Sequence, residues 1–104
     1  MAWLMIGVAG VFEIAFALGL KYSDGFTRLW PTVLTAVSLS LSMVLLSLAI
    51  RSLPVGTAYA IWTGIGAAGT AALGMLLFGE SSAPLRVFFL VCIAGSVIGL
   101  KFSS

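Results

Sequence analysis

Four long apolar runs, broken by only one charged side chain, constrain what this chain can fold into more than any other feature of its sequence. They span residues 2–20, 29–50, 55–79 and 87–100, with lengths of 19, 22, 25 and 14 residues. A helix that crosses a lipid bilayer needs about 20 predominantly apolar residues. The fourth run is short, but it reaches this length when Arg86 and Lys101 at its ends extend their charged groups to the lipid surface.

Short segments separate the runs, at residues 21–28, 51–54 and 80–84. They contain most of the charged residues and each contains a turn-forming Gly or Pro, which is typical of loops at a membrane surface. We therefore expect an all-α membrane protein in which residues 1–104 form a single four-helix transmembrane domain. The expected helices cover residues 2–20, 29–50, 55–79 and 84–102.

The composition excludes several classes of function. Of the 104 residues, 62% are hydrophobic and 8% are charged, whereas soluble domains carry roughly 25% charged residues. The chain has no histidine and a single cysteine, Cys92, so it cannot build a histidine-based metal site, a catalytic triad or an intramolecular disulfide. Five Lys and Arg residues are too few for the clustered basic face that binds nucleic acid. We expect a protein of the lipid bilayer that is not an enzyme, with no metal, no cofactor and no nucleic-acid partner.

The positive charges are almost evenly divided between the two membrane surfaces that this arrangement defines. One surface receives Arg51 and Lys101, and the other receives Lys21, Arg28 and Arg86. Orientation in a membrane is normally set by a clear excess of Lys and Arg on the cytoplasmic side. Since the difference is one residue, we hypothesise that the protein inserts in both orientations. The alternative is that one residue of bias suffices to fix a single orientation.

Glu13 is the one charged residue inside the four apolar runs. A charged side chain near the middle of a transmembrane helix costs about 2.5–3.5 kcal/mol on insertion scales, and such residues commonly mark ion or substrate pathways. No Lys or Arg lies at a comparable depth in any of the four predicted spans. Glu13 is therefore either protonated or available to a mobile cation, and the competition of both for one carboxylate would couple their movements. The alternative is that Glu13 extends its carboxylate toward the lipid surface or forms an interhelical hydrogen bond.

Several residues fall on helical faces that could surround this carboxylate. Gly10 and Phe16 share the face of Glu13 on the first span, and Ser42 lies in a stripe of hydroxyl residues on the second. The candidates on one face of the third span are Tyr59, Trp62, Thr63 and Gly66. Aromatic faces attract cations, and Trp does so most strongly. Hydroxyl residues in membrane helices also commonly bond their own backbone or a neighbouring helix.

Glycines indicate bending or close packing in the third and fourth spans. Gly64 and Gly66 allow either a hinge or a close helix contact in the third span. Gly95 and Gly99 form a small-xxx-small pattern in the fourth, which suits packing on a second copy of the chain. Because four short helices cannot enclose a cavity and also hide an acid from lipid, we expect a homodimer. If its two copies insert oppositely, the dimer is antiparallel and resembles the inverted repeats of larger transporters.

The chain resembles the small multidrug resistance family over essentially its full length. The motifs that carry the resemblance are AGVFE at residues 9–13, KYSDGFTRL at residues 21–29 and, most specifically, LPVGTAYAIWTGIG at residues 53–66. Within the family, the chain is most similar to the guanidinium-exporter subtype. The features that favour this subtype are Gly10, Ser42, Trp62-Thr63-Gly64, Gly79-Glu80 and Gly99-Leu100-Lys101.

The resemblance implies an antiparallel, dual-topology homodimer in the bacterial inner membrane that exchanges protons for guanidinium by alternating access. It also implies that Glu13 of both subunits forms a shared proton and substrate site, with Tyr59, Trp62 and Ser42 around it. Phe16 departs from the subtype, which usually has Trp at this position. Because phenylalanine has no N–H to donate and leaves more room, substituted guanidinium compounds join guanidinium among the expected substrates.

Two other functions remain open from the sequence. The first is a multidrug exporter of the same family, which would move quaternary ammonium and aromatic cations. The second is a structural or regulatory membrane subunit that transports nothing. A heterodimer with a different partner is the alternative to the homodimer.

Overall fold

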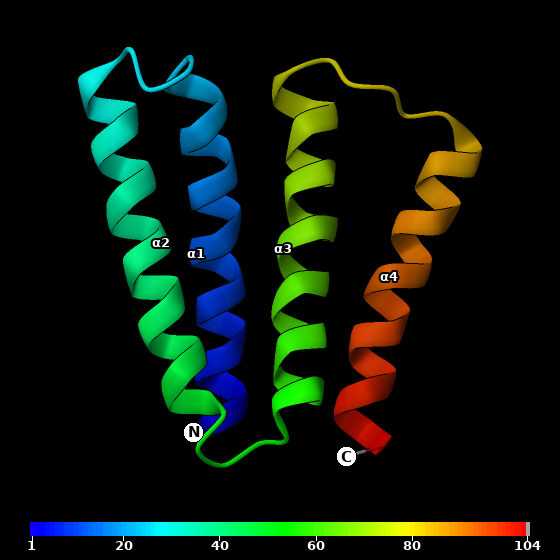
Figure 1. Ribbon diagram of the computed structural model, residues 1–104. Helices are drawn as coiled ribbons and strands as arrows, with labels where there is room; N and C mark the ends of the chain where they lie inside the picture. The colour runs from blue at the N-terminus through cyan, green and yellow to red at the C-terminus, as the bar shows by residue number, and fades with distance from the viewer. Residues whose placement is uncertain (104) are drawn as a thin grey trace.

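The structure, a computed structural model, describes residues 1–103, and four α-helices make up most of this part of the chain (Figure 1). They are α1 (Ala2–Tyr22), α2 (Leu29–Ala49), α3 (Val55–Leu77) and α4 (Pro84–Ser103). Each is long and apolar enough to cross a membrane. The prediction of four membrane-spanning helices is thus confirmed.

The helix ends differ from the predicted ones by one or two residues. Helix α1 continues beyond the predicted end at residue 20, because the N–H of Ser23 still bonds to the carbonyl of Gly19 at 2.8 Å. Helix α3 ends before the predicted residue 79, because Gly79 adopts a left-handed conformation with φ of 64°. Helix α2 ends one residue earlier than predicted and α4 one residue later.

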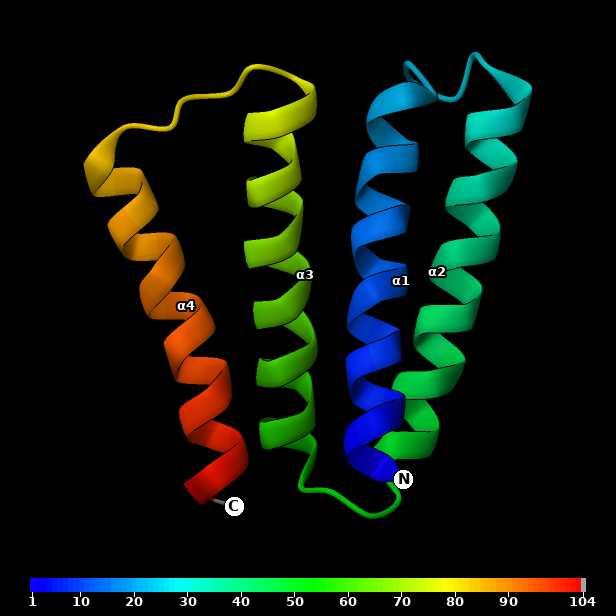
Figure 2. The same ribbon diagram turned by 180° about the vertical axis from the view of Figure 1, so that it is seen from behind.

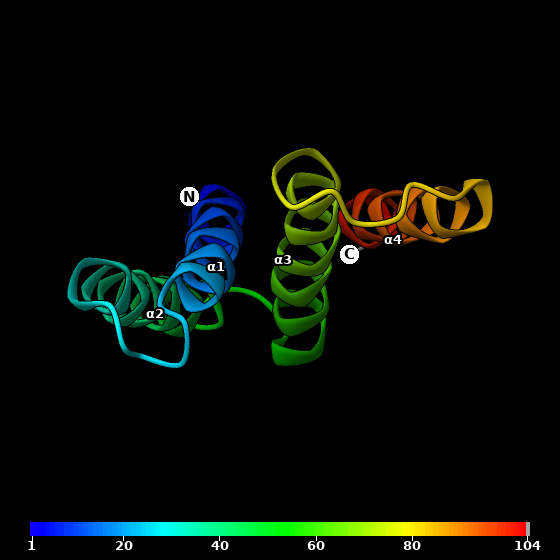
Figure 3. The ribbon, with the colours of Figure 1, turned by 90° about the horizontal axis from the view of Figure 1, so that it is seen from above.

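The helices lie side by side in one layer. Viewed from above, their order is α2, α1, α3, α4 (Figure 3), and the molecule measures 40 × 34 × 16 Å. Its thickness is little more than the diameter of roughly 10–12 Å of one helix with its side chains. Helix α1 packs against both α2 and α3, whereas α4 packs against α3 and diverges from it toward the 78–83 loop (Figure 2).

The buried apolar core lies where the N-terminal halves of α1 and α3 meet the C-terminal half of α2. Its members are Ile6, Ala9, Leu46, Ala49, Ala58, Ile61 and Trp62. Small residues bring the helices together at this level: a Cβ at Gly10 would lie 2.8 Å from Cβ of Ile65. This core fixes α1 against α3 directly below the turn that carries Glu13.

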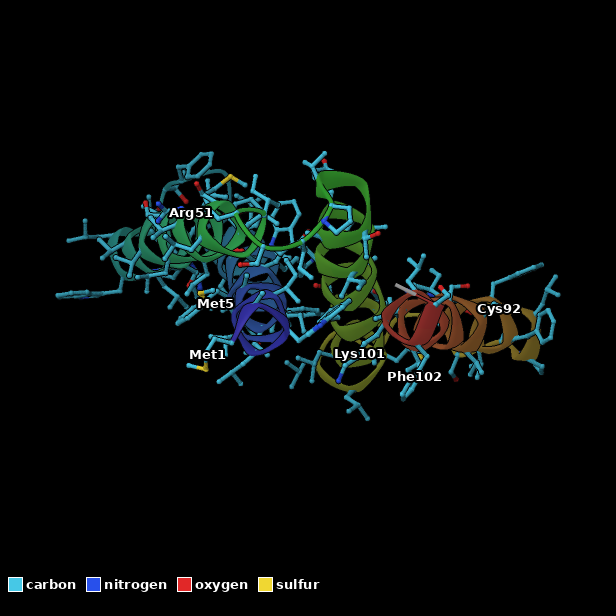
Figure 4. All side chains as sticks on the ribbon, turned by 90° about the horizontal axis from the view of Figure 1, so that it is seen from below. Met1, Met5, Arg51, Cys92, Lys101 and Phe102 are labelled. Atoms are coloured by element: carbon cyan, nitrogen blue, oxygen red, sulfur yellow. The ribbon has the colours of Figure 1, made fainter. Side chains whose placement is uncertain are left out.

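Within the described part of the chain, no residue of α4 is buried. Along its length, Phe88, Val91 and Ile98 are 57%, 63% and 59% exposed. At its C-terminal end, Lys101 approaches the start of α1, where its ammonium group lies 5.9 Å from the ring centre of Trp3 (Figure 4). A single chain therefore leaves a long apolar helix largely uncovered.

The N-terminus, the 50–54 loop and the C-terminal end of α4 lie at one end of the layer, and the other two loops lie at the opposite end (Figure 1). The first end carries Arg51 and Lys101 (Figure 4). The opposite end carries Lys21, Arg28 and Arg86. The positive residues are thus divided between the two ends of the layer as expected for four helices that alternate in direction.

Candidate functional site

The Glu13 side chain lies half-buried between α1 and α3, against Gly66. A Cβ placed on Gly66 would be 2.8 Å from Oε1 of Glu13, and it would meet the Oε2 and Cδ atoms still more closely. The carboxylate therefore occupies the space that any side chain at position 66 would need. The sequence predicts Gly66 as a hinge or packing residue. It lies directly against the Glu13 carboxylate, within a helix that is continuous from Val55 to Leu77.

The Glu13 carboxylate has an unsatisfied oxygen. Its Oε2 atom is buried, and no group within residues 1–103 forms a hydrogen bond with it. The ion pair found in this part of the chain joins Arg86 to Glu80 and leaves Glu13 without a cationic partner there. A buried oxygen in this position either binds a proton or accepts N–H donors from a cation, because an isolated ionised carboxylate is costly away from water.

An open cavity of about 370 Å³ extends from Glu13 toward the 78–83 loop. It is lined by Glu13, Ala17, Thr63, Gly66, Ala67, Thr70, Ala71, Glu80 and Arg86. Its volume is within the range of roughly 300–1,000 Å³ that is typical of small-molecule sites. The cavity gives a small polar cation room to reach the carboxylate from the loop end of the molecule.

A chain of hydrogen bonds fixes the three helices one turn away from Glu13. Ser42 on α2 donates from Oγ to the backbone carbonyl of Ala9 on α1 at 2.7 Å. Trp62 on α3 donates from Nε1 to Oγ of Ser42, also at 2.7 Å. The ring of Tyr59 lies edge-on to Trp62, with 5.4 Å between ring centres. Since Ala9 precedes Glu13 by four residues, this network holds the helical turn from which the acid projects.

The structure separates the sequence-predicted residues into groups. Glu13, Thr63 and Gly66 line the cavity. Ser42, Trp62 and Tyr59 belong to the neighbouring hydrogen-bonded and aromatic cluster, in which Tyr59 is 56% exposed. The Trp62 indole N–H is therefore engaged with Ser42 rather than with the carboxylate.

The remaining predicted residues are not among those that line the Glu13 cavity. Phe16 is half-buried on α1 and is not among the residues that line the Glu13 cavity. Gly10 packs against Ile65, and Gly64 allows α4 to approach α3 through Val97. Gly95 and Gly99 are exposed, and a Cβ at either would meet nothing within 4 Å in the described residues.

Sequence reasoning missed three polar residues of the cavity: Thr70, Glu80 and Arg86. The sequence predicts Arg86 as the charged end of the fourth span and Glu80 as a feature of the subtype, and Thr70 lies outside the predicted site residues of α3. Thr70 follows Gly66 by four residues, so the helical face of the acid would have identified it. No local pattern in the sequence indicates that Glu80 and Arg86 line this cavity.

Comparisons with known proteins agree with this architecture. Residues 1–93 match the family model described as Small Multidrug Resistance protein. The chain is 52% identical over 104 residues to a protein of Yersinia pseudotuberculosis named "Guanidinium exporter", and the alignment covers both chains completely. It is 51% identical to proteins of the same name from Citrobacter freundii and Salmonella typhimurium, with 100% of this chain and 99% of each relative covered.

Proposed function

Because this chain belongs to the small multidrug resistance family, we propose that it is a multi-pass inner-membrane antiporter that exports guanidinium in exchange for protons. The observation that carries this proposal is the buried Oε2 atom of Glu13, which lacks a hydrogen-bond partner in residues 1–103, on a side chain that lines an open cavity. Full-length relatives named as guanidinium exporters support the choice of cation.

The chemistry of the site suits this exchange. Guanidinium presents a planar fork of N–H donors, which matches the two oxygens of a carboxylate. A proton and a guanidinium ion neutralise the same Glu13 charge and so compete for it. If the protein changes its open side only when Glu13 is loaded, outward movement of one ligand requires inward movement of the other. The coupling then needs no cofactor.

We also propose that the working unit is an antiparallel homodimer with Glu13 of both copies in a shared site. The 16 Å thickness of the single layer leaves the cavity open to the side. The exposed apolar surface of α4 and the open space at Gly95 and Gly99 suit close packing of a second copy. Opposite insertion would give both faces the same architecture, so that exchanging the two conformations reverses the open side.

The exchange is tested with purified protein in liposomes. Guanidinium added to one side should drive proton movement, read by a pH-sensitive dye. Glu13→Gln keeps the size and hydrogen-bonding capacity of the side chain but cannot ionise, so it should abolish coupled flux while helicity and dimer content persist. Wild-type flux in the Gln variant would remove Glu13 from the mechanism, and absence of flux in the wild-type protein would favour the non-transporting membrane subunit.

The dual orientation is tested by cysteine labelling in intact cells. Cys92 is exposed and must first be replaced by Ser. A cysteine at exposed Ser52 then reports on the loop between α2 and α3. An impermeant maleimide should label part of the population from outside, and a permeant reagent should label the rest. Complete labelling or complete protection from outside would establish a single orientation.

Substituted guanidinium compounds are proposed as further substrates. A cavity of about 370 Å³ leaves room for substituents beside the bound guanidinium group. A transport panel that compares guanidinium, an alkylguanidinium and an aromatic quaternary ammonium dye separates this range from that of a general multidrug exporter. Faster transport of the dye than of guanidinium would favour the multidrug exporter.

A further inference from the structure

A second carboxylate, Glu80, lies on the same cavity as Glu13, at its outer end in the loop between α3 and α4. The turn that places it there is specific. Gly79 adopts φ of 64°, and the N–H groups of Phe78 and Glu80 both bond to the carbonyl of Gly74, at 3.0 and 3.3 Å. This turn directs the Glu80 side chain onto α3, where it packs against Gly74.

The Glu80 carboxylate is held against α3 in the same manner as that of Glu13. A Cβ on Gly74 would be 2.7 Å from Cδ and 3.0 Å from Oε2 of Glu80, and it would meet Oε1 more closely still. Gly66 accommodates Glu13 in this way eight residues earlier. At a rise of about 1.5 Å per residue, the two glycines are about 12 Å apart along the helix. Thr70 lies midway between them and lines the cavity.

Glu80 is occupied by a guanidinium group of this chain. Arg86 donates from Nη2 to Oε1 of Glu80 at 2.9 Å and from Nη1 to the carbonyl of Ser81 at 2.7 Å. Within residues 1–103, the contact is made through one carboxylate oxygen, and Oε2 forms no hydrogen bond or ion pair. Both side chains are accessible, at 33% and 44% exposed. Exposed pairs of this kind contribute little net stability, so a cation from solution can replace Arg86.

We propose that Glu80 is an outer binding site for guanidinium-type cations on the route to Glu13, and that Arg86 is its built-in competitor. The Arg86 side chain ends in the same planar group as the proposed substrate. An arriving guanidinium ion binds Oε2 first, displaces Arg86 from Oε1, and then passes Thr70 to reach Glu13. This inference rests on the proposed function for the direction of transport, but binding at Glu80 does not require transport.

The transport test uses the KM for guanidinium in liposomes. Arg86→Gln removes the competitor and should lower KM about two- to fivefold, whereas Glu80→Gln should raise it by a similar factor. Arg86→Lys keeps the charge and still competes for Glu80, so its KM should stay close to that of the wild type. Asp24→Asn removes an acidic charge at the same end of the molecule, away from the cavity, and should leave KM unchanged.

The double variant Glu80→Gln/Arg86→Gln separates competition from simple charge repulsion. If Arg86 acts by occupying Glu80, its removal should have no effect once Glu80 is neutral, and the double variant should match Glu80→Gln. If Arg86 only repels incoming cations through space, its removal should lower KM by the same factor in both backgrounds. That result, or an unchanged KM in Glu80→Gln, would overturn the proposal.

A binding measurement keeps the outer site distinct from the transport function. In Glu13→Gln protein with ¹⁵N-labelled arginine, the Nε–H resonance of Arg86 is assigned by its loss in Arg86→Lys. Titration with guanidinium chloride should move this resonance in a saturable way, and sodium chloride at the same ionic strength should not. Equal shifts with both salts would overturn the outer site even if the wild type transports guanidinium. A guanidinium-specific shift, combined with an absence of guanidinium-driven flux in the wild-type protein, would instead remove the proposed function and keep the site.

Discussion

Gly66→Ala should separate the position of the Glu13 carboxylate from the stability of the fold. The added methyl group would lie 2.8 Å from Oε1 of Glu13 and closer to Oε2 and Cδ. Ordinary contacts of a Cβ begin near 3.4 Å, so the carboxylate must move by roughly 1 Å. Displacements of this size in a binding constellation cost up to about 100-fold in rate. We expect kcat/KM for guanidinium to fall about 10- to 100-fold.

Stability should change little in the same variant. Alanine in a helix interior is favoured over glycine by roughly 0.5–1 kcal/mol. The group that must move is the end of a flexible side chain, so the clash is relieved by rotation of Glu13 rather than by separation of α1 from α3. We therefore expect the free energy of unfolding in detergent to stay within about 1 kcal/mol of the wild-type value.

Gly56→Ala is the matched control for Gly66→Ala. It places the same substitution in the same helix, where a Cβ would meet nothing within 4 Å of described atoms. This variant should transport guanidinium at the wild-type rate. If Gly66→Ala also transports within twofold of the wild type, the contact of Glu13 with Gly66 is not part of the transporting site.

Two further variants test the surroundings of the acid. Ser42→Ala leaves the buried Trp62 indole N–H without its acceptor and should lower the free energy of unfolding by about 1–2 kcal/mol. The control Ser40→Ala removes an exposed hydrogen bond to a carbonyl of its own helix and should change the free energy of unfolding by less than about 0.5 kcal/mol. Equal losses of stability in the two variants would show that the hydrogen bonds through Ser42 do not stabilise the fold. Phe16→Trp should narrow transport toward guanidinium and against substituted guanidinium compounds if the larger ring extends into the cavity. An unchanged ratio of the two transport rates would place Phe16 outside the site. Phe16 is not among the residues that line the Glu13 cavity.

Hydropathy alone was sufficient to predict the four helices, because each run of apolar residues must satisfy its backbone internally in lipid. The ends were less predictable, since they depend on local turns such as the left-handed Gly79. Glu13 could be identified from sequence because a carboxylate among apolar residues is chemically exceptional. Its surroundings depend on which faces of α1 and α3 meet, and close approaches at Gly10 and Gly66 determine that packing.

Helical periodicity predicts which candidate residues share a face, but it does not specify their hydrogen-bond partners. Ser42 and Trp62 lie on faces directed toward the acid-bearing helix, but their polar atoms satisfy each other and the carbonyl of Ala9. Glu80 and Arg86 illustrate a different limit. Their place on the Glu13 cavity depends on the turn at the end of α3, in which the N–H groups of Phe78 and Glu80 bond to the carbonyl of Gly74. Neither hydropathy nor periodicity contains that information.

The attachment of α4 along a single neighbour has a mechanical consequence. A force applied at the C-terminus of one protomer would peel α4 from α3 one turn at a time, because no buried side chain of α4 must be extracted from the described core. Helices α1 to α3 would resist together, since the hydrogen bonds through Ser42 join all three. A second copy packed against α4 would shift the first rupture to higher force, so the rupture force of this one helix would report on the association of two chains.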